Sequence, residues 1–238
     1  LLLLNSYEIS LLLGKEAWLW INWKIRTVKV LCKPDIRNLR YTNWSIDGLQ
    51  ASLKQSMDAL SNNVPQAVRD HLIVSQNLAT YGWFQWEFYT VSLAWSLTSI
   101  EMALIPKFLE YYRGQQITLE NKRTKETKTI IVDSGIFPEL RKGWRIQGKP
   151  GFNGSFKSFI EWAKNENMFQ GTPIVLQELL IMLQENKRCG NIRASSPLDL
   201  IPDLRNQLIH MEQNLIFPPQ SAIDGLNQAV QVINRLFP

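Results

Sequence analysis

The chain has 238 residues, a length that suits one large domain or a domain with an appendage. Hydrophobic residues make up 45% and charged residues 20%, an ordinary globular composition that excludes a wholly disordered or collagen-like chain. The formal net charge of +5 is a weak indication of a polyanionic partner.

Histidine and cysteine are scarce, which limits the chemistry available to the chain. With only two histidines, His71 and His210, a three-histidine metal site cannot be built within one copy. The two cysteines, Cys32 and Cys189, lie far apart and form no C-x-x-C zinc motif. We therefore expect no cofactor, and a reducing, cytoplasmic setting.

The N-terminal part of the chain is apolar and rich in tryptophan. Residues 1–13 resemble a signal-peptide core, but they lack a preceding basic stretch and are interrupted by polar residues, so we expect buried structure there. Residues 17–32 partly alternate apolar and polar side chains, which predicts one or two strands. We find no apolar run of membrane-spanning length and expect no membrane partner.

Helices are predicted over most of the remaining chain. Residues 46–60 form the first, with Ser45 as its N-cap, and residues 65–80 form the second. The most apolar stretch, residues 83–112, predicts a helix buried on most sides, which Pro106 kinks or breaks into two. Further helices are predicted at residues 155–165, 173–184, 202–214 and 221–237, with a polar loop at 185–195.

The helix predicted over residues 83–112 carries a thin polar stripe. Four positions of the stripe fall within one arc of about 60° when residues are projected at about 100° each. These positions are Glu87, Ala94, Thr98 and Glu101. The stripe makes Glu101 a candidate for lining a site inside a helical bundle.

Basic residues are concentrated between Arg113 and Lys149. Nine Lys and Arg residues and four Asp and Glu residues give this stretch a net charge of +5, equal to that of the whole chain. Residues 116–132 predict a β-hairpin with a charged tip at 122–125, followed by a turn-rich segment. The hairpin is either a solvated surface or an arm that contacts RNA. The candidate RNA-binding residues are Lys122, Arg123, Lys125, Arg141 and Lys142.

Residues 202–214, PDLRNQLIHMEQN, hold the most persuasive chemical motif. In a helical projection, Arg205, Asn206 and His210 share one face, separate from the apolar stripe. That stripe contains Leu204, Leu208, Met211 and Leu215. Arg205 also falls in the first turn of the predicted helix, where free backbone N–H groups favour anions.

The residue types on this face suit metal-free phosphodiester cleavage. An imidazole such as that of His210 moves protons near neutral pH, and a guanidinium such as that of Arg205 stabilises charge developing on a phosphate. Asn206 can orient either partner or the substrate. RNA cleavage needs both an acid and a base, and one chain offers one Arg–His pair, so we expect a homodimer that presents two such faces to each other.

The motif RNQLIH at residues 205–210 resembles that of the HEPN superfamily. Its members are helical bundles marked by an Arg followed, after four to six residues, by a His. A long apolar upstream helix with an inner acidic residue is similar to the stretch around Glu101, and an amphipathic helix also closes the chain. The resemblance covers roughly residues 64–238. It predicts a mainly α fold with an appendage at residues 1–63 and an inserted basic hairpin at about 114–150.

The resemblance implies a metal-independent endoribonuclease in a toxin–antitoxin system or in phage defence. In such enzymes a ribose 2′-hydroxyl attacks the adjacent phosphate and leaves a 2′,3′-cyclic phosphate. Arg205, Asn206, His210 and Glu101 would be the catalytic residues, with RNA as substrate and an antitoxin or another defence protein as partner. Some members control activity through a Tyr two residues after the His, but this chain has Glu212 there.

Two alternatives stay open at this point. Some HEPN proteins are inactive and serve as RNA-binding or dimerisation modules. A helical protein unrelated to HEPN, whose Trp-rich N-terminal part binds another chain, is the third interpretation. We expect His71 to have a structural role, because no matched partner accompanies it in the sequence.

Overall fold

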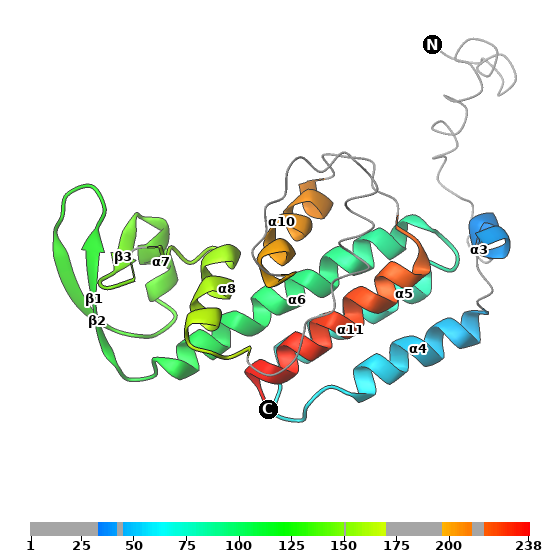
Figure 1. Ribbon diagram of the computed structural model, residues 1–238, viewed down its shortest axis with the longest axis horizontal. Coiled ribbons are helices and arrows are strands. Elements are labelled where there is room, and N and C mark those ends of the chain that lie inside the picture. Colours follow the sequence, from blue (N-terminus) through cyan, green and yellow to red (C-terminus); the bar gives the residue numbers. More distant parts are fainter. Residues whose placement is uncertain (1–32, 42–44, 150, 170–196, 211–216) are drawn as a thin grey trace, which may run out of the picture.

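A computed structural model of the chain describes residues 33–41, 45–149, 151–169, 197–210 and 217–238. Most of these residues form helices, and three short strands form a small antiparallel sheet, so the chain is mainly helical as predicted (Figure 1). In chain order the elements are α3 (Ile36–Tyr41), α4 (Ile46–Asp58), α5 (Gln66–Tyr81), α6 (Glu87–Tyr111), β1 (Gln116–Asn121), β2 (Thr127–Ile131), α7 (Ile136–Arg141), β3 (Trp144–Ile146), α8 (Phe156–Asn165), α10 (Pro197–His210) and α11 (Pro219–Leu236).

The central element is α6, against which α5, α8, α10 and α11 all pack. Pro106 lies inside α6 and lacks the N–H that would bond the carbonyl of Met102, yet the helix continues to Tyr111. Of the two predicted outcomes, a kink or a break into two helices, the break does not occur. Phe108, fully buried two residues later, stacks on Phe152 with ring centroids 4.8 Å apart. This aromatic packing stabilises the last turn beyond the proline.

By length and composition alone α6 could span a membrane, a possibility that the sequence pattern did not indicate. Of its apolar stretch, 56% is buried inside the bundle, and core helices of soluble proteins have the same length and composition. The apolar side chains are used for packing against the neighbouring helices. Those that are fully buried include Leu93, Leu97, Ile100 and Leu104.

The buried polar residues of α6 lie where the helix faces α5, not on the predicted stripe. Ser92, Ser96 and Ser99 are all fully buried. The Ser75 hydroxyl on α5 donates to the Ser92 carbonyl at 2.8 Å and lies 2.6 Å from the Ser96 hydroxyl, and the Ser92 hydroxyl donates to the Ser75 carbonyl. The small side chains let the two helices approach closely while each hydroxyl has a partner.

His71 extends this polar contact between α5 and α6. Its Nδ1 lies 2.8 Å from the Ser99 hydroxyl, and its ring stacks on Trp95 with centroids 4.7 Å apart and planes 8° apart. Burial lowers the pKa of His71 below its ordinary value, because desolvation disfavours the charged ring. These contacts support the structural role expected for this histidine.

A short helix that the sequence did not predict, α3, is attached to the start of α6 by polar contacts. Arg37 forms ion pairs with Asp35 and with Glu87, each at 2.8 Å. Burial would raise the pKa of Asp35, but hydrogen bonds from Arg37 and from the Trp86 N–H hold it well below its usual range. Glu87, from the predicted polar stripe, therefore serves a contact with α3.

The predicted helix starts and the predicted hairpin are largely confirmed. The Ser45 hydroxyl accepts the Gly48 N–H at 3.0 Å and caps α4, and the hairpin forms with Ile117 opposite Ile130. The turn-rich segment after it contains two elements that were not predicted, α7 and the strand β3, which pairs with β1. On α11 the predicted buried face is confirmed by Ile223, Leu226, Val230 and Ile233.

The predicted boundary at residue 63 falls between two helices that share a core. On its N-terminal side α4 packs against α5 and α11, and Leu49 and Leu53 are fully buried. Four other predictions lie outside the described residues: buried structure at 1–13, strands at 17–32, the helix at 173–184 and the loop at 185–195.

The low pKa of His71 makes stability depend on pH. The unfolded chain, in which His71 titrates near 6.5, binds more protons than the folded chain between the two pKa values. The free energy of unfolding should therefore fall as pH is lowered from about 7 to about 5. Urea unfolding across this range should show a smaller slope for His71→Gln than for wild type. An identical slope would contradict the lowered pKa of the partly buried His71.

Candidate functional site

The motif helix α10 is longer at its N-terminal end than predicted. It begins at Pro197 instead of Pro202, and it ends at His210 within the described residues. Asp199, in its first turn, forms an ion pair with Lys164 of α8, with Nζ and Oδ1 2.7 Å apart. Arg205 is consequently more than two turns from the helix start, so the expectation that free first-turn N–H groups help it attract anions is wrong.

Arg205 lies at the junction of three helices. Its Nη2 donates to Oε2 of Glu101 on α6, and the two groups form an ion pair although 104 positions separate them in sequence. Its guanidinium carbon lies 5.2 Å from the ring centroid of Phe156, the first residue of α8. The sequence-predicted pair Glu101 and Arg205 is thus brought together, with an aromatic face that the sequence did not indicate.

The remaining donors of Arg205 are used unequally. Nη1 donates to Oδ1 of Asn206 at 2.7 Å. Nε is buried and has no hydrogen-bond partner within the described part of the chain. A buried donor on a charged group is costly when unsatisfied, and native proteins keep few of them. The Nε–H of the guanidinium is therefore a buried donor that an acceptor entering the junction could satisfy.

Glu101 and Arg205 are mostly but not fully buried. Their side chains are 24% and 17% exposed. The carboxylate neutralises much of the guanidinium charge, so an incoming anion has to replace or share this partner.

The other predicted members of the motif face lie further along α10. Asn206 is exposed, and Ile209 is 49% exposed. His210 is the last residue of the helix, about 7.5 Å along the axis from Arg205 at 1.5 Å per residue, and its side chain lies outside the described part of the chain. Leu204 and Leu208 are buried, as predicted for the opposite stripe.

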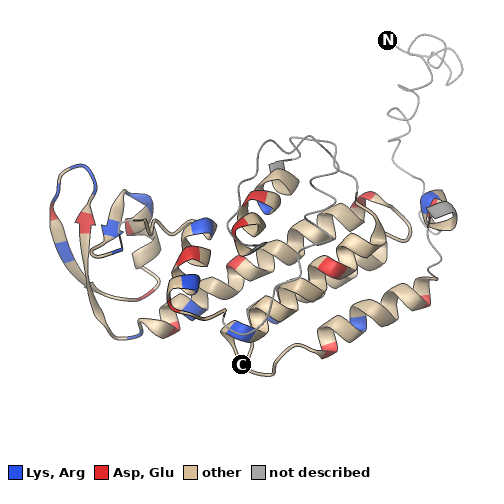
Figure 2. Cartoon of the chain, in the orientation of Figure 1, with Lys and Arg blue, Asp and Glu red and all other residues tan. Residues whose placement is uncertain are grey.

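The predicted RNA-binding residues lie in a different region. Lys122, Arg123 and Lys125 are exposed at the turn between β1 and β2, and Arg141 and Lys142 are exposed at the end of α7 (Figure 2). In Figure 1, α8 lies between this sheet region and α10. The structure therefore does not bring the two predicted sets together.

Acidic neighbours partly neutralise the basic region. Lys125 pairs with Glu120 at 3.1 Å, and Lys142 pairs with Glu139 at 3.1 Å. Contacts with Lys128 and Lys142 hold the pKa of Glu139 below its usual range. Within the described residues, no ion pair involves Lys122, Arg123 or Arg141, and two of these three cations lie at the hairpin turn.

The described residues contain no group of three or more His, Cys, Asp or Glu side chains that could hold a metal ion. Comparison with known proteins identifies no matching family model, no similar curated protein and no similar solved structure. The geometry of the Glu101–Arg205 junction is therefore the main basis for assigning a function.

The Glu101–Arg205 ion pair should stabilise the packing of α10 on α6 and so add to the free energy of unfolding. In a double-mutant cycle with Glu101→Gln and Arg205→Gln, we expect a coupling energy of about 1–2 kcal/mol in the free energy of unfolding. The exposed pair Lys54–Asp58, whose side chains are 69% and 61% exposed, is the control. It should give about 0.3–0.5 kcal/mol, as exposed helical pairs do. Equal coupling energies in the two cycles would show that partial burial does not strengthen the Glu101–Arg205 ion pair.

Proposed function

We propose that the chain is a metal-independent endoribonuclease with a HEPN-like helical bundle. The observation that carries this proposal is the junction at which Arg205 meets Glu101, Asn206 and Phe156 while one buried donor stays unsatisfied. The order of elements also fits, because a long apolar helix with Glu101 precedes the motif helix and an amphipathic helix follows it.

The chemistry follows from the functional groups on α10. A ribose 2′-hydroxyl loses its proton to a base and attacks the adjacent phosphorus, and the bond from phosphorus to the 5′-oxygen breaks. The leaving 5′-oxygen takes a proton from an acid, which gives a 2′,3′-cyclic phosphate and a 5′-hydroxyl. His210 supplies the acid or the base, and Arg205 stabilises the charge on the pentavalent phosphorane.

In this proposal Glu101 and Asn206 position the guanidinium of Arg205. Both hold the guanidinium in place through its Nη atoms, so the fork is positioned before substrate binds. A scissile phosphate then competes with the Glu101 carboxylate and satisfies Nε. Exchange of one anionic partner for another keeps the guanidinium paired throughout.

A second copy of the chain completes the site in this proposal. One α10 supplies one histidine, whereas the reaction has an acid step and a base step, so two motif faces related by a two-fold axis would share the work. The biological setting proposed is cytoplasmic, in a toxin–antitoxin or phage-defence system with an inhibitory protein partner.

The test is incubation of the protein with 5′-labelled RNA in EDTA. Wild type should cleave and leave 2′,3′-cyclic phosphate ends, and His210→Ala should lower the rate by at least about 100-fold, the usual contribution of a general acid or base. His71→Gln, which removes the other histidine, should cleave at the wild-type rate. Absence of cleavage by wild type, or equal rates for His210→Ala and wild type, would overturn the catalytic proposal.

A non-catalytic RNA-binding or dimerisation module is the second candidate. It is favoured by the neutralisation of Arg205 by Glu101 and by the separate position of the basic hairpin. Under this proposal RNA binds to the hairpin turn without turnover, and the Glu101–Arg205 pair only joins two helices.

An endoribonuclease and a non-catalytic RNA-binding module would both use the hairpin turn to bind RNA, and the salt dependence of binding tests this. Replacing Lys122 and Arg123 together by Gln should weaken single-stranded RNA binding and lower the slope of log affinity against log salt by about 1.4, since each phosphate that a cation neutralises adds about 0.7. Lys54→Gln, an exposed change on α4, is the control and should leave the slope unchanged. An unchanged slope in the double variant would make the hairpin a solvated surface only.

A further inference from the structure

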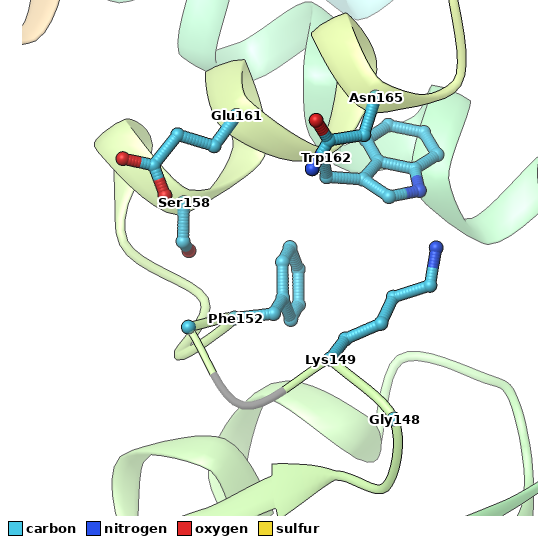
Figure 3. A pocket seen from close by; sticks show the side chains of 8 residues that line it. Gly148, Lys149, Phe152, Ser158, Glu161, Trp162 and Asn165 are labelled. Atoms are coloured by element: carbon cyan, nitrogen blue, oxygen red, sulfur yellow. The ribbon is translucent and has the colours of Figure 1, made fainter.

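A cavity of about 320 Å³ lies between the loop that follows β3 and the helix α8 (Figure 3). Its volume is at the small end for ligand sites, enough for one ring system with its substituents. The residues that line it and are used below are Lys149, Phe152, Glu161, Trp162 and Asn165. None of them belongs to the Glu101–Arg205 junction.

Two aromatic side chains form the apolar part of the lining. Phe152 stacks in parallel on Phe108 with planes 4° apart, so Phe108 fixes the orientation of the Phe152 ring. Trp162 contacts Phe108 edge to face at 5.0 Å and is 3% exposed. At Gly148 and Gly151, which also line the cavity, an added Cβ would meet no atom within 4 Å, so both glycines border open space.

Trp162 carries a buried hydrogen-bond donor that the fold does not use. Its Nε1 is fully buried and has no hydrogen-bond partner among the residues that the structure describes. An unsatisfied buried N–H costs about 1–3 kcal/mol, so its presence in the wall of a cavity points to a ligand acceptor. Figure 3 shows the indole nitrogen on the edge of the ring that faces the Lys149 ammonium.

The charges of the lining select against a simple anion. The Lys149 ammonium is paired with Glu166, and although burial opposes its charge, this contact raises the pKa of Lys149 above its ordinary value. The Glu161 carboxylate adds a negative charge to the opposite part of the lining (Figure 3). The exposed Asn165 adds an amide that donates and accepts.

We propose that this cavity binds one nucleobase that carries a carbonyl next to a ring N–H, as uracil does. The flat ring would lie against Phe152 and Trp162, the carbonyl would accept from Trp162 Nε1, and the adjacent ring N–H would donate to the amide oxygen of Asn165. The base can come from a free nucleoside or from an unpaired nucleotide of RNA. Its binding does not depend on the proposed cleavage reaction.

The test measures binding of uridine and of a 2′-deoxy tetrauridine, which a 2′-hydroxyl mechanism cannot cleave, by calorimetry and ligand-observed NMR. Uridine should bind with a millimolar or lower Kd, and adenosine, which lacks the carbonyl, more weakly. Trp162→Phe, which keeps a ring but removes the donor, should weaken uridine binding about tenfold, the effect of one hydrogen bond. The control Trp144→Phe, on β3 outside the lining, should not.

Asn165→Ala, an exposed change that leaves the core intact, should also weaken binding even if Trp162→Phe fails to fold. Equal dependence of both ligands on these residues would identify the base alone as sufficient. Binding of the tetranucleotide alone, with the same dependence, would identify an unpaired nucleotide of a nucleic-acid strand as the source. Absence of binding by either ligand, or binding insensitive to both substitutions, would overturn the proposal, whatever the outcome of the cleavage assay.

Discussion

The burial of α6 is the constraint on which the rest of the structure depends. Each neighbouring helix contacts α6 through a different interaction: α5 through paired serine hydroxyls, α8 through aromatic rings, and α10 through the Glu101–Arg205 ion pair. On the α11 side, Gly225 permits the closest approach, since an added Cβ would lie 2.3 Å from Cδ1 of Leu93. The position of Arg205 is therefore set by a helix that is itself held by its other neighbours.

Local sequence signals predicted what local chemistry decides. Ser45 caps α4 because a hydroxyl before an apolar periodic stretch satisfies a free N–H, and the apolar period of α11 required one buried face. The helical projection also placed Glu101 on a stripe, and the structure puts it against the motif helix. The start of α10 was missed because Pro197 and Pro202 both suit a first turn, and the Lys164–Asp199 contact that favours the earlier start comes from another helix.

Tertiary contacts account for the other omissions. The strand β3 has only three residues, too few for a pattern, and exists because β1 offers it a free edge. The serines of α6 could not be assigned a role from the sequence, because their partner Ser75 lies on another helix. The contact of Arg205 with Phe156 could not be predicted, because nothing in either segment indicates which aromatic ring the guanidinium meets.

The helix α8 connects the two sites that carry the functional proposals. Phe156 at its N-terminal end lies under Arg205, and Trp162 further along forms the wall of the cavity next to the basic sheet region. An RNA strand that followed α8 would pass from the hairpin to the motif helix. Under the proposed function, the basic residues would hold the strand and Arg205 would act on one phosphate.

The most direct test of the account is a crystal structure of the protein with a short RNA that carries a 2′-O-methyl group at the cleavage position. We expect a phosphate within hydrogen-bonding distance of Arg205, the Glu101 carboxylate displaced from Nη2, and His210 beside the modified ribose. An intact Glu101–Arg205 pair with the RNA bound elsewhere would contradict the catalytic role of this junction.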